Sequence, residues 1–304
     1  MHDAKRTYRG RFAPSPTGPL HFGSLVAAVG SFLEARGRGG EWLVRMEDLD
    51  RPRETPGAAD AIMRTLEAYG FEWDGEVVFQ SRRDAAYGAA LASLEKQGVV
   101  FPCVCTRREI SDSSLSMAGE PVYPGTCRQG VSPGRLAHST RVRVEGAVVA
   151  FEDTLQGRIE QNLAREVGDF VVRRSDGLFA YQLAVVVDDF EQGITHVVRG
   201  ADLLASTPRQ ALLQRMLAYP TPQYSHLPIA VNRNGEKLSK QTLAAPLADR
   251  EAPVELVRAL RFLGQNAHAD LAAASIPEIW AWARKNWRHD AIPRRRSLPE
   301  SEAR

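Results

Sequence analysis

The sequence predicts an α/β protein built on a parallel sheet, with an inserted α+β unit and a mainly helical C-terminal region. A strand–helix–strand–helix order begins near Tyr8, and the same alternation returns after Tyr181. Between them lie three clustered cysteines and two segments that alternate apolar and polar residues, as antiparallel strands do. These features divide the 304-residue chain into four predicted parts: residues 1–81, 82–180, 181–231 and 232–304.

The first elements follow from helical spacing and turn residues. Residues 8–13 favour a strand, and residues 24–37 favour a helix with Leu25, Ala28, Val29 and Phe32 on one face and Gly37 as its stop. A second strand is predicted over residues 41–48. Thr55 is suited to cap the next helix, with Pro56 at its first position and Tyr69 near its end.

Later elements are predicted in the same way. Residues 80–98 favour a helix, and the cysteine segment that follows is rich in Gly, Pro and Ser, as loops are. Antiparallel strands are expected over 140–153 and 169–177, and the α/β pattern returns over 194–204, 208–217 and 226–232. Three tryptophans near the C-terminus are expected to pack a small helical bundle: Trp280, Trp282 and Trp287.

The composition is typical of a globular protein in water. Hydrophobic residues make up 43% of the chain and charged residues 25%. The net charge of +2 is too small to establish a nucleic-acid partner. No apolar run has membrane-spanning length and the N-terminus lacks a signal-peptide core, so we expect a cytoplasmic protein with no membrane partner. Separately, we expect a monomer. The odd number of cysteines argues against a disulfide framework.

The stretch "RFAPSPTGPLHFGSL", residues 11–25, predicts an anion site. A strand that ends in a Pro/Gly turn and enters a helix points backbone N–H groups and the helix dipole at whatever lies there. His21 would add a side-chain donor, and Gly23 would let a ligand approach the backbone. An ordinary strand-to-helix turn explains the composition alone equally well.

A second stretch, "NRNGEKLSKQT" at residues 232–242, places Lys237 and Lys240 three residues apart after a glycine turn. Such lysines are usually solvated, but they are also suited to closing over a polyphosphate. "HFGS" and "KLSKQ", in this order, resemble the HIGH and KMSKS signatures of class I aminoacyl-tRNA synthetases. Together with "RMEDLD", "YQLAVVVDD" and "THVVRGADLL", they resemble the glutamyl-tRNA synthetase family. Ser24 and Gln241 depart from the two signatures.

The resemblance implies a class I synthetase with a Rossmann-like parallel sheet. Its catalytic domain would comprise 1–81 and 181–231, split by a zinc-containing acceptor-binding unit over 82–180. A KMSKS-like loop and a helical stem-contact bundle would follow over 232–304. The implied reaction is attack of an amino acid's carboxylate on the α-phosphorus of ATP, with loss of pyrophosphate. The family's catalytic positions match His21, Lys237 and Lys240, and its ATP-binding positions match Pro14, His21, Gly23, Ser24 and Lys240; Mg²⁺ would arrive with ATP.

The implied amino acid is L-glutamate, a dicarboxylate with an ammonium group. Arginine binds a carboxylate with a two-pronged fork that lysine cannot copy. The family's glutamate-binding positions match Arg11, Ser15, Glu47, Tyr181 and Arg199, with Glu47 facing the ammonium. Each residue taken alone could instead be a surface ion pair or a core edge.

The cysteine segment "CVCTRREI…VYPGTCR" raises a metal question. Three clustered thiols could be small buried hydrophobes, although three thiolates and one oxygen would also suit tetrahedral Zn²⁺. The resemblance implies a structural zinc site, which we assign to Cys103, Cys105, Tyr123 and Cys127. His138 is the alternative fourth ligand.

The final acceptor is inferred from length. Only 64 residues follow Lys240, whereas full glutamyl-tRNA synthetases continue with a large anticodon-binding region. The shorter plan resembles the glutamyl-queuosine tRNA(Asp) branch of the family. That resemblance implies tRNA-independent activation of glutamate, then transfer to queuosine at anticodon position 34 of tRNA(Asp). The alternatives are a truncated enzyme that charges tRNA(Glu), a non-catalytic tRNA-binding paralogue, and a ligase with a small-molecule acceptor.

Overall fold

The computed structural model describes residues 7–111, 121–131, 134–135, 139–232, 234–238 and 245–303. Its strands are β1 (Arg9–Phe12), β2 (Glu41–Met46), β3 (Val78–Phe79), β4 (Val100–Cys103), β5 (Ser139–Val142), β6 (Val148–Asp153), β7 (Gly157–Asn162), β8 (Phe170–Arg173), β9 (His196–Gly200), β10 (Gln223–Leu227), β11 (Ile229–Val231) and β12 (Ser297–Pro299). Its α-helices are α1 (Phe22–Arg36), α2 (Ala58–Ala68), α3 (Asp84–Lys96), α4 (Arg107–Ser111), α5 (Leu163–Glu166), α6 (Tyr181–Glu191), α7 (Thr207–Met216), α8 (Ala252–Phe262) and α9 (Ile276–Asn286). Short 3₁₀ turns are η1 (Arg51–Arg53), η2 (Gln80–Arg82), η3 (Ala201–Ser206), η5 (Asp249–Glu251), η6 (Ala269–Ala273), η7 (His289–Ala291) and η8 (Glu300–Ala303).

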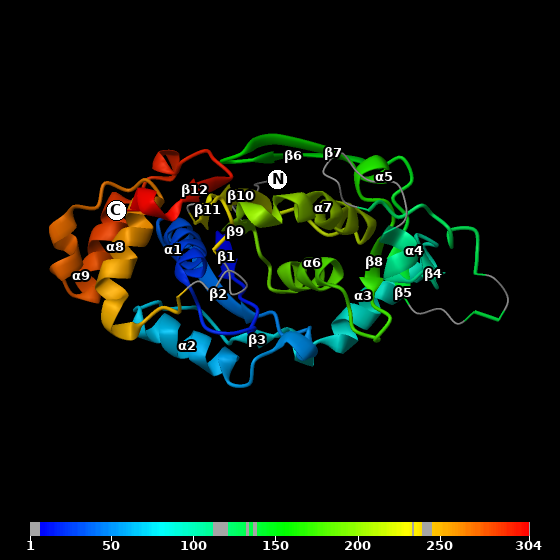
Figure 1. The fold of residues 1–304 in the computed structure, drawn as a ribbon, viewed down its shortest axis with the longest axis horizontal. Helices are drawn as coiled ribbons and strands as arrows, with labels where there is room; N and C mark the ends of the chain where they lie inside the picture. The colour runs from blue at the N-terminus through cyan, green and yellow to red at the C-terminus, as the bar shows by residue number, and fades with distance from the viewer. Residues whose placement is uncertain are drawn as a thin grey trace, which may run out of the picture.

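Two sheets, one wholly parallel and one with a parallel centre, form the middle of an elongated molecule (Figure 1). In one, β1, β2 and β3 pair in that order; in the other, β9 pairs with β10. The sheets are joined beside β1 and β9, where the Thr195 amide donates to the Arg9 carbonyl at 3.0 Å and its hydroxyl accepts from the Arg9 amide at 2.8 Å. Residues from widely separated parts of the chain therefore lie side by side, as expected for an α/β protein.

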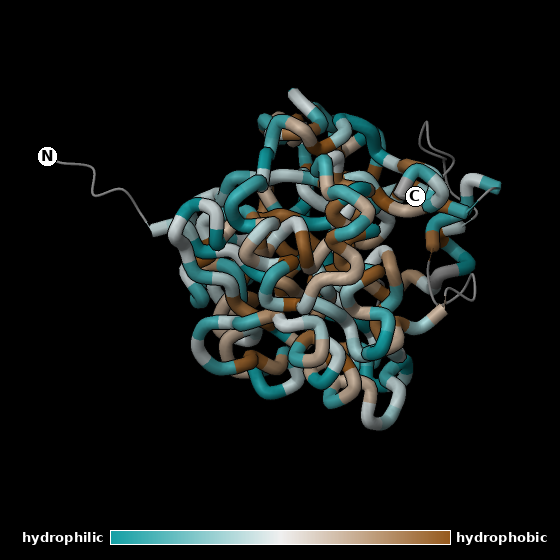
Figure 2. The backbone as a smooth tube through the Cα atoms, turned by 90° about the vertical axis from the view of Figure 1, so that its left-hand side faces the viewer, coloured by the Kyte–Doolittle hydropathy of each residue, from teal (hydrophilic) through white to brown (hydrophobic). Residues whose placement is uncertain are grey.

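Helix α1 packs its apolar face into the largest core. Its predicted face is fully buried, and Phe32 lies edge-on to Trp42, with ring centroids 5.2 Å apart. Figure 2 shows the resulting pattern, with apolar segments concentrated inside and hydrophilic segments outside. Burying such aromatic and aliphatic side chains is the main force that holds these layers together.

The C-terminal tryptophans differ from the prediction. Trp280 in α9 packs on Phe32, with centroids 4.8 Å apart, and donates to the Tyr69 carbonyl at 2.9 Å. Trp287 donates to Glu34 of α1 at 2.8 Å. These residues therefore belong to the core of the N-terminal half rather than to a separate bundle, because the apolar stripe of α9 is turned toward α1.

Two local predictions are also corrected, and one strand was missed. Helix α2 begins at Ala58, because Gly57 precedes it with φ 75°, so Thr55 and Pro56 lie before the helix. The cysteine segment begins in strand β4, which pairs antiparallel with β5, rather than in a loop. Strand β7, which was not predicted, pairs antiparallel with β6.

The β6–β7 ribbon, residues 148–162, joins two predicted parts of the chain. Asp153 of β6 is paired in parallel with Tyr224 of β10, so the ribbon belongs to the sheet of β9 and β10. In Figure 1 it runs along one side of the molecule from β10 to α5. The four-part division of the chain stays a prediction, and the ribbon shows that residues 82–180 touch the central sheet directly. Among the described helices, none is long and apolar enough to cross a membrane.

Candidate active site

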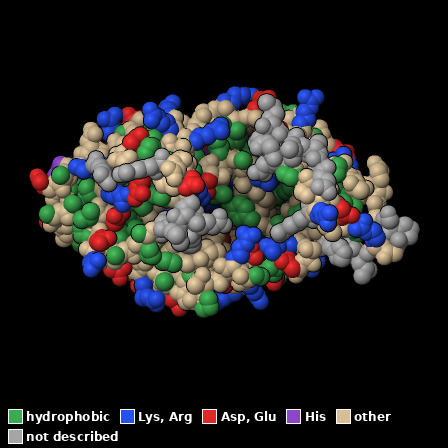
Figure 3. Space-filling view, in the orientation of Figure 1, with side chains coloured by type: hydrophobic (Ala, Val, Ile, Leu, Met, Phe, Trp, Pro, Cys, Tyr) green, Lys and Arg blue, Asp and Glu red, His purple; other side chains and the backbone are tan. Residues whose placement is uncertain are grey.

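A cavity of about 670 Å³ lies at the carboxyl ends of the parallel strands. The ends of β1, β9 and β10, the segment after β2 and the start of α1 all contribute to its walls, the usual place for a ligand site in an α/β sheet. Figure 3 shows the corresponding face hollowed near its middle. Ten of the predicted site residues line this cavity: Arg11, Pro14, Ser15, His21, Gly23, Ser24, Glu47, Tyr181, Arg199 and Lys237.

His21 is the N-cap of α1. Its Nδ1 accepts from the Ser24 amide at 3.3 Å, so the neutral ring carries its proton on Nε2. Gly23 leaves room for that ring, since a Cβ there would lie 3.2 Å from the imidazole Cε1 atom. The helix start thus combines a positive dipole end with a side-chain N–H, which suits an anion such as phosphate.

Arg11 is held by a carboxylate that it shares with another arginine. Its Nε and Nη2 donate to the two oxygens of Asp189 at 3.0 and 3.3 Å, and Arg45 donates to the same carboxylate at 2.9 Å. Burial alone raises the pKa of Asp189, but the two guanidinium groups outweigh it and hold that pKa below its usual value. Within the described residues Arg11 uses two of its five N–H groups in this way, which leaves donors for the cavity.

Glu47 lies beside the same pair. Arg45 approaches its carboxylate at 3.4 Å. Burial is the largest influence and raises the pKa of Glu47, although Arg45 and Arg11 oppose the rise. A cationic group bound in the cavity next to Glu47 would therefore favour its ionised form.

Arg199 is held by neutral acceptors instead. Its Nη2 donates to Thr207 Oγ1 and Gln210 Oε1, both at 2.8 Å, and its Nε donates to His226 Nε2 at 3.1 Å. Its Nη1 reaches the Tyr181 hydroxyl at 3.4 Å. Arg199 as a whole is 5% exposed, so these partners set the orientation of its guanidinium.

Behind Arg199 lies a buried pair that the sequence analysis did not single out. His226 Nδ1 contacts Asp153 Oδ2 at 2.6 Å, and both side chains are fully buried. Burial lowers the pKa of His226, against the opposing influence of Asp153. Burial alone raises the pKa of Asp153, but the bond from His226 outweighs it and lowers that pKa.

Arg45 and Asp189 were also missed as site residues. Each gave a signal, since Arg45 interrupts an apolar strand and Asp189 ends the apolar run "AVVVDD". A charge inside a buried segment needs a partner, so each pattern indicated an ion pair. The sequence did not show that Arg45 and Asp189 are partners of each other.

The second lysine signature is only partly covered. Lys237 lines the cavity and forms an ion pair with Asp202 of η3. Lys240 and Gln241 lie outside the described residues, so their predicted roles stay predictions. The described part of this segment approaches α1 through Leu238, whose carbonyl would be 3.6 Å from a Cβ at Gly23.

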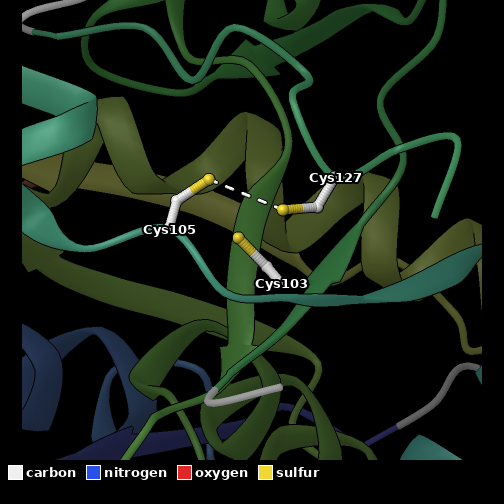
Figure 4. Close-up of side chains that lie close together, drawn as sticks. All are labelled: Cys103, Cys105 and Cys127. Carbon is white, nitrogen blue, oxygen red and sulfur yellow. Dashed lines mark hydrogen bonds between the residues drawn. The ribbon is translucent and has the colours of Figure 1, made fainter. Parts of the chain in front are cut away.

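The three cysteines form a cluster at the far end of the molecule. Their sulfur atoms lie within 4.8 Å of one another, and Cys105 and Cys127 are 3.5 Å apart (Figure 4). The Tyr123 hydroxyl lies 3.6 Å from Cys103 Sγ and 3.9 Å from Cys105 Sγ, so the structure brings the four predicted ligands together. His138 lies outside the described residues.

The thiols differ in their surroundings. Burial alone raises the pKa of Cys103, but hydrogen bonds with Tyr123, the Cys105 backbone and Arg141 outweigh it and lower that pKa to about 7. Burial raises the pKa of Cys105 to about 11. Arg141 donates to Cys103 at 3.3 Å and lies over the Tyr123 ring, 4.0 Å from its centroid, so a cation is already placed beside the cluster.

Comparison with known proteins identifies the class. The family described as "tRNA synthetases class I (E and Q), catalytic domain" matches residues 7–271. A glutamate-tRNA synthetase from Elizabethkingia anophelis has the same fold, with a TM-score of 0.79 at 23% identity over 98% of this chain and 69% of that one. The molecule therefore has the α/β fold of a class I synthetase, with its parallel sheet.

Closer relatives narrow the family. A "Glutamyl-Q tRNA(Asp) synthetase" from Dechloromonas aromatica is 62% identical over 94% of this chain and 96% of the relative. One of the same name from Aromatoleum aromaticum is 59% identical over 97% and 93%. This chain belongs to the glutamyl-Q tRNA(Asp) synthetase family within the class I tRNA synthetases.

Proposed function

We propose that this protein activates L-glutamate with ATP in the absence of tRNA, and then transfers glutamate to queuosine at position 34 of tRNA(Asp). The names of relatives at 62% and 59% identity support this assignment. The observation that carries it is the convergence of Arg11, Arg199 and the His21 helix start on one cavity. Because the acceptor is a tRNA, we place the reaction in the cytoplasm.

The first step needs positive charge more than a base. The α-carboxylate attacks the α-phosphorus of ATP and pyrophosphate leaves, so negative charge grows on phosphoryl oxygens. His21 Nε2–H and the first N–H groups of α1 are suited to hold the phosphates, beside Pro14, Gly23 and Ser24. Lys237 and Lys240 would stabilise the pentacoordinate phosphorus and the leaving pyrophosphate. Mg²⁺ would enter with ATP and neutralise phosphate charge.

Glutamate would bind between the two arginines. Arg11 has N–H groups without a partner among the described residues, and these could make a two-pronged contact with a carboxylate; Arg199 adds charge and Nη1. Glu47 suits the ammonium, and Ser15 and Tyr181 add hydroxyl groups. An amide in place of the side-chain carboxylate would turn its own donors toward guanidinium donors, so the pocket should reject glutamine.

We also propose that the cysteine cluster holds a structural zinc ion. In tetrahedral coordination with Zn–S bonds near 2.3 Å, thiolate sulfurs lie about 3.8 Å apart. The 3.5 Å separation of Cys105 and Cys127, and the 3.6 Å approach of Tyr123 to Cys103, fit that shape. Arg141 would offset the negative charge of three thiolates. Zinc would tie Cys103, Cys105, Tyr123 and Cys127 together, and the site would stabilise residues 82–180 as the acceptor-binding unit.

One experiment tests the assignment against its alternatives. Glutamate-dependent ATP–pyrophosphate exchange is measured without tRNA, and glutamate transfer is then compared on tRNA(Asp) with and without queuosine. We expect exchange without tRNA and transfer only to the queuosine-containing form. Exchange that requires tRNA(Glu) would identify a truncated glutamyl-tRNA synthetase, and absence of exchange would identify a binding paralogue. Exchange with no transfer to any tRNA would identify a ligase for a small acceptor.

Lys240→Ala sharpens the test of the first step. Removal of one well-placed donor to a developing charge typically lowers the rate roughly 10²- to 10³-fold. We expect exchange to be nearly abolished, with the fold preserved in thermal melting. Exchange at the wild-type rate would remove Lys240 from the catalytic residues.

A further inference from the structure

Asp153, His226 and Arg199 form a single buried chain of hydrogen bonds. Asp153 Oδ1 accepts from three backbone amides, of Leu155, Gln156 and His226, at 3.1, 2.9 and 3.2 Å. Its Oδ2 faces His226 Nδ1 at 2.6 Å, and His226 Nε2 accepts from Arg199 Nε at 3.1 Å. The carboxylate is thus held by the backbone and is left with one oxygen for the imidazole.

The chain fixes which nitrogen of His226 carries the proton. An ionised Asp153 can only accept, so Nδ1 must donate. Nε2 is then the acceptor that an arginine N–H requires, since guanidinium has no acceptor of its own. Thr207 Oγ1 lies 3.2 Å from the same Nε2 and accepts from Arg199 Nη2, so both contacts agree with this tautomer.

We infer that Asp153 and His226 are positioning residues for glutamate recognition: they lock Arg199 so that its Nη1 faces the cavity. Four of the five N–H groups of Arg199 have protein partners among the described residues, and the bond to Tyr181, at 3.4 Å, is the longest of them. Glutamate would therefore meet an arginine whose plane is already set, which lowers the entropy lost on binding. This inference rests on the proposed function.

Asp153 and His226 come from different parts of the chain, and Asp153 is far in sequence from Arg199. Asp153 ends β6 of the β6–β7 ribbon, whereas His226 lies in β10 and Arg199 in β9. The pairing of Asp153 with Tyr224 places β10, which carries His226, between the ribbon and β9, which carries Arg199. The β6–β7 ribbon thus helps to position Arg199, although none of its residues lines the cavity.

Three variants separate positioning from simple stability. Asp153→Asn keeps an oxygen for the three amides but turns an NH₂ toward His226, so the ring would shift its proton to Nε2 and meet the Arg199 N–H with a donor. His226→Asn reaches Asp153 but not Arg199, whereas His226→Gln reaches Arg199 but not Asp153. We expect Asp153→Asn and His226→Asn to raise KM for glutamate about tenfold or more, with KM for ATP within about twofold.

His226→Gln should have a lower KM for glutamate than His226→Asn, because it still contacts Arg199. We nevertheless expect His226→Gln to have the lower melting temperature of the two, because it leaves a buried Asp153 oxygen unpaired. Ser225→Ala is the matched control, because it removes the 2.9 Å hydrogen bond between Thr154, which directly follows β6, and Ser225 of β10. This bond lies next to the Asp153–His226 contact but does not involve Arg199. Its KM for glutamate should equal that of the wild type. If Asp153→Asn does not fold, the inference is tested by comparing the KM for glutamate of His226→Asn with that of His226→Gln.

The outcomes that overturn the inference are distinct. A KM for glutamate that follows melting temperature across the variants, or that rises equally with KM for ATP, would show a purely structural pair. Folded Asp153→Asn and His226→Asn proteins with wild-type KM would overturn the inference alone. Absence of glutamate-dependent exchange in the wild type would overturn the proposed function, and this inference with it.

Discussion

The two arginines of the cavity are held by opposite chemistry. Arg11 is fixed by a charged partner, because Asp189 binds it with both oxygens and also binds Arg45. Arg199 is fixed by neutral acceptors, from Thr207, Gln210 and His226. Its nearest counter-charge in this chain of contacts, Asp153, lies beyond the imidazole ring.

This difference indicates that the two arginines contribute differently to the stability of the fold and to ligand binding. The Arg11 side is an ion-pair network whose charges already compensate one another, so it contributes to the fold as well as to binding. The Arg199 side keeps more of its positive field for a ligand, because neutral acceptors fix its direction without cancelling its charge. Substitutions on the two sides should therefore be seen in different measurements.

The largest effect is expected for Asp189→Asn. The change leaves two buried guanidinium groups without their shared carboxylate, and breaking a buried ion pair on one side typically costs about 3–5 kcal/mol. We expect the free energy of unfolding, measured in urea, to fall by that amount. Asp176→Asn is the control, since its bond to Arg174 is largely exposed and should matter by less than about 1 kcal/mol. An equal loss in both variants would contradict the assigned network.

Arg199→Lys should change activity more than stability. A lysine ammonium cannot reach His226, Thr207 and Gln210 together while it presents a planar edge to a carboxylate. We expect kcat/KM for glutamate in pyrophosphate exchange to fall about 100-fold or more. The apparent affinity for ATP should stay near that of the wild type. A loss of less than about tenfold would mean that charge alone suffices on this side.

The sequence predicted the parts of this pocket that belong to local motifs. His21, Gly23, Glu47 and Lys237 lie in short recognisable stretches, and the cavity contains all four. The strand–helix order that begins near Tyr8 and returns after Tyr181 likewise predicted the parallel strand pairs. These features depend on neighbours in the chain, which a sequence displays directly.

The supporting contacts could not be predicted because they depend on distant pairings. Arg45 meets Asp189 across 144 positions, and Asp153 meets His226 across 73. Each residue shows only that a buried polar group needs some partner. The tryptophans were misassigned for the same reason: the apolar stripe of α9 was visible, but not the surface of α1 that covers it.

Glu34 allows a comparison in which only stability should change, by a smaller amount, because this buried carboxylate does not line the cavity. Burial alone raises the pKa of Glu34, but hydrogen bonds from His289 and Trp287, both at 2.8 Å, outweigh it and lower that pKa. A depressed pKa in the folded state gives stability that is present above the unfolded value near 4.3 and is lost as pH falls through the folded value.

The corresponding test compares the wild type with Glu34→Gln in urea unfolding between pH 6 and pH 3. We expect the wild type to be more stable by about 1–2 kcal/mol at pH 6, with the difference shrinking below about pH 4.3. Glutamate exchange at neutral pH should be the same in both proteins. A difference that grows on acidification would show that Glu34 is not stabilised as a carboxylate.

The smallest effect on the pocket is expected for loss of the proposed metal. The cysteine cluster packs in its own small core with Phe101 and Val104, apart from the cores that support the cavity. Because distant sites without shared partners act independently, chelation of the metal or Cys127→Ser should leave the KM for glutamate in pyrophosphate exchange within about twofold of the wild-type value.

Metal analysis should show about one zinc per chain in the wild type and loss of that zinc in the variant, as four-ligand structural sites require. Transfer to tRNA should fall in the same samples, because residues 82–180, which we propose to be the acceptor-binding unit, would lose the metal that stabilises them. A parallel loss of exchange and transfer would mean that the cluster and the two arginines form one cooperative unit.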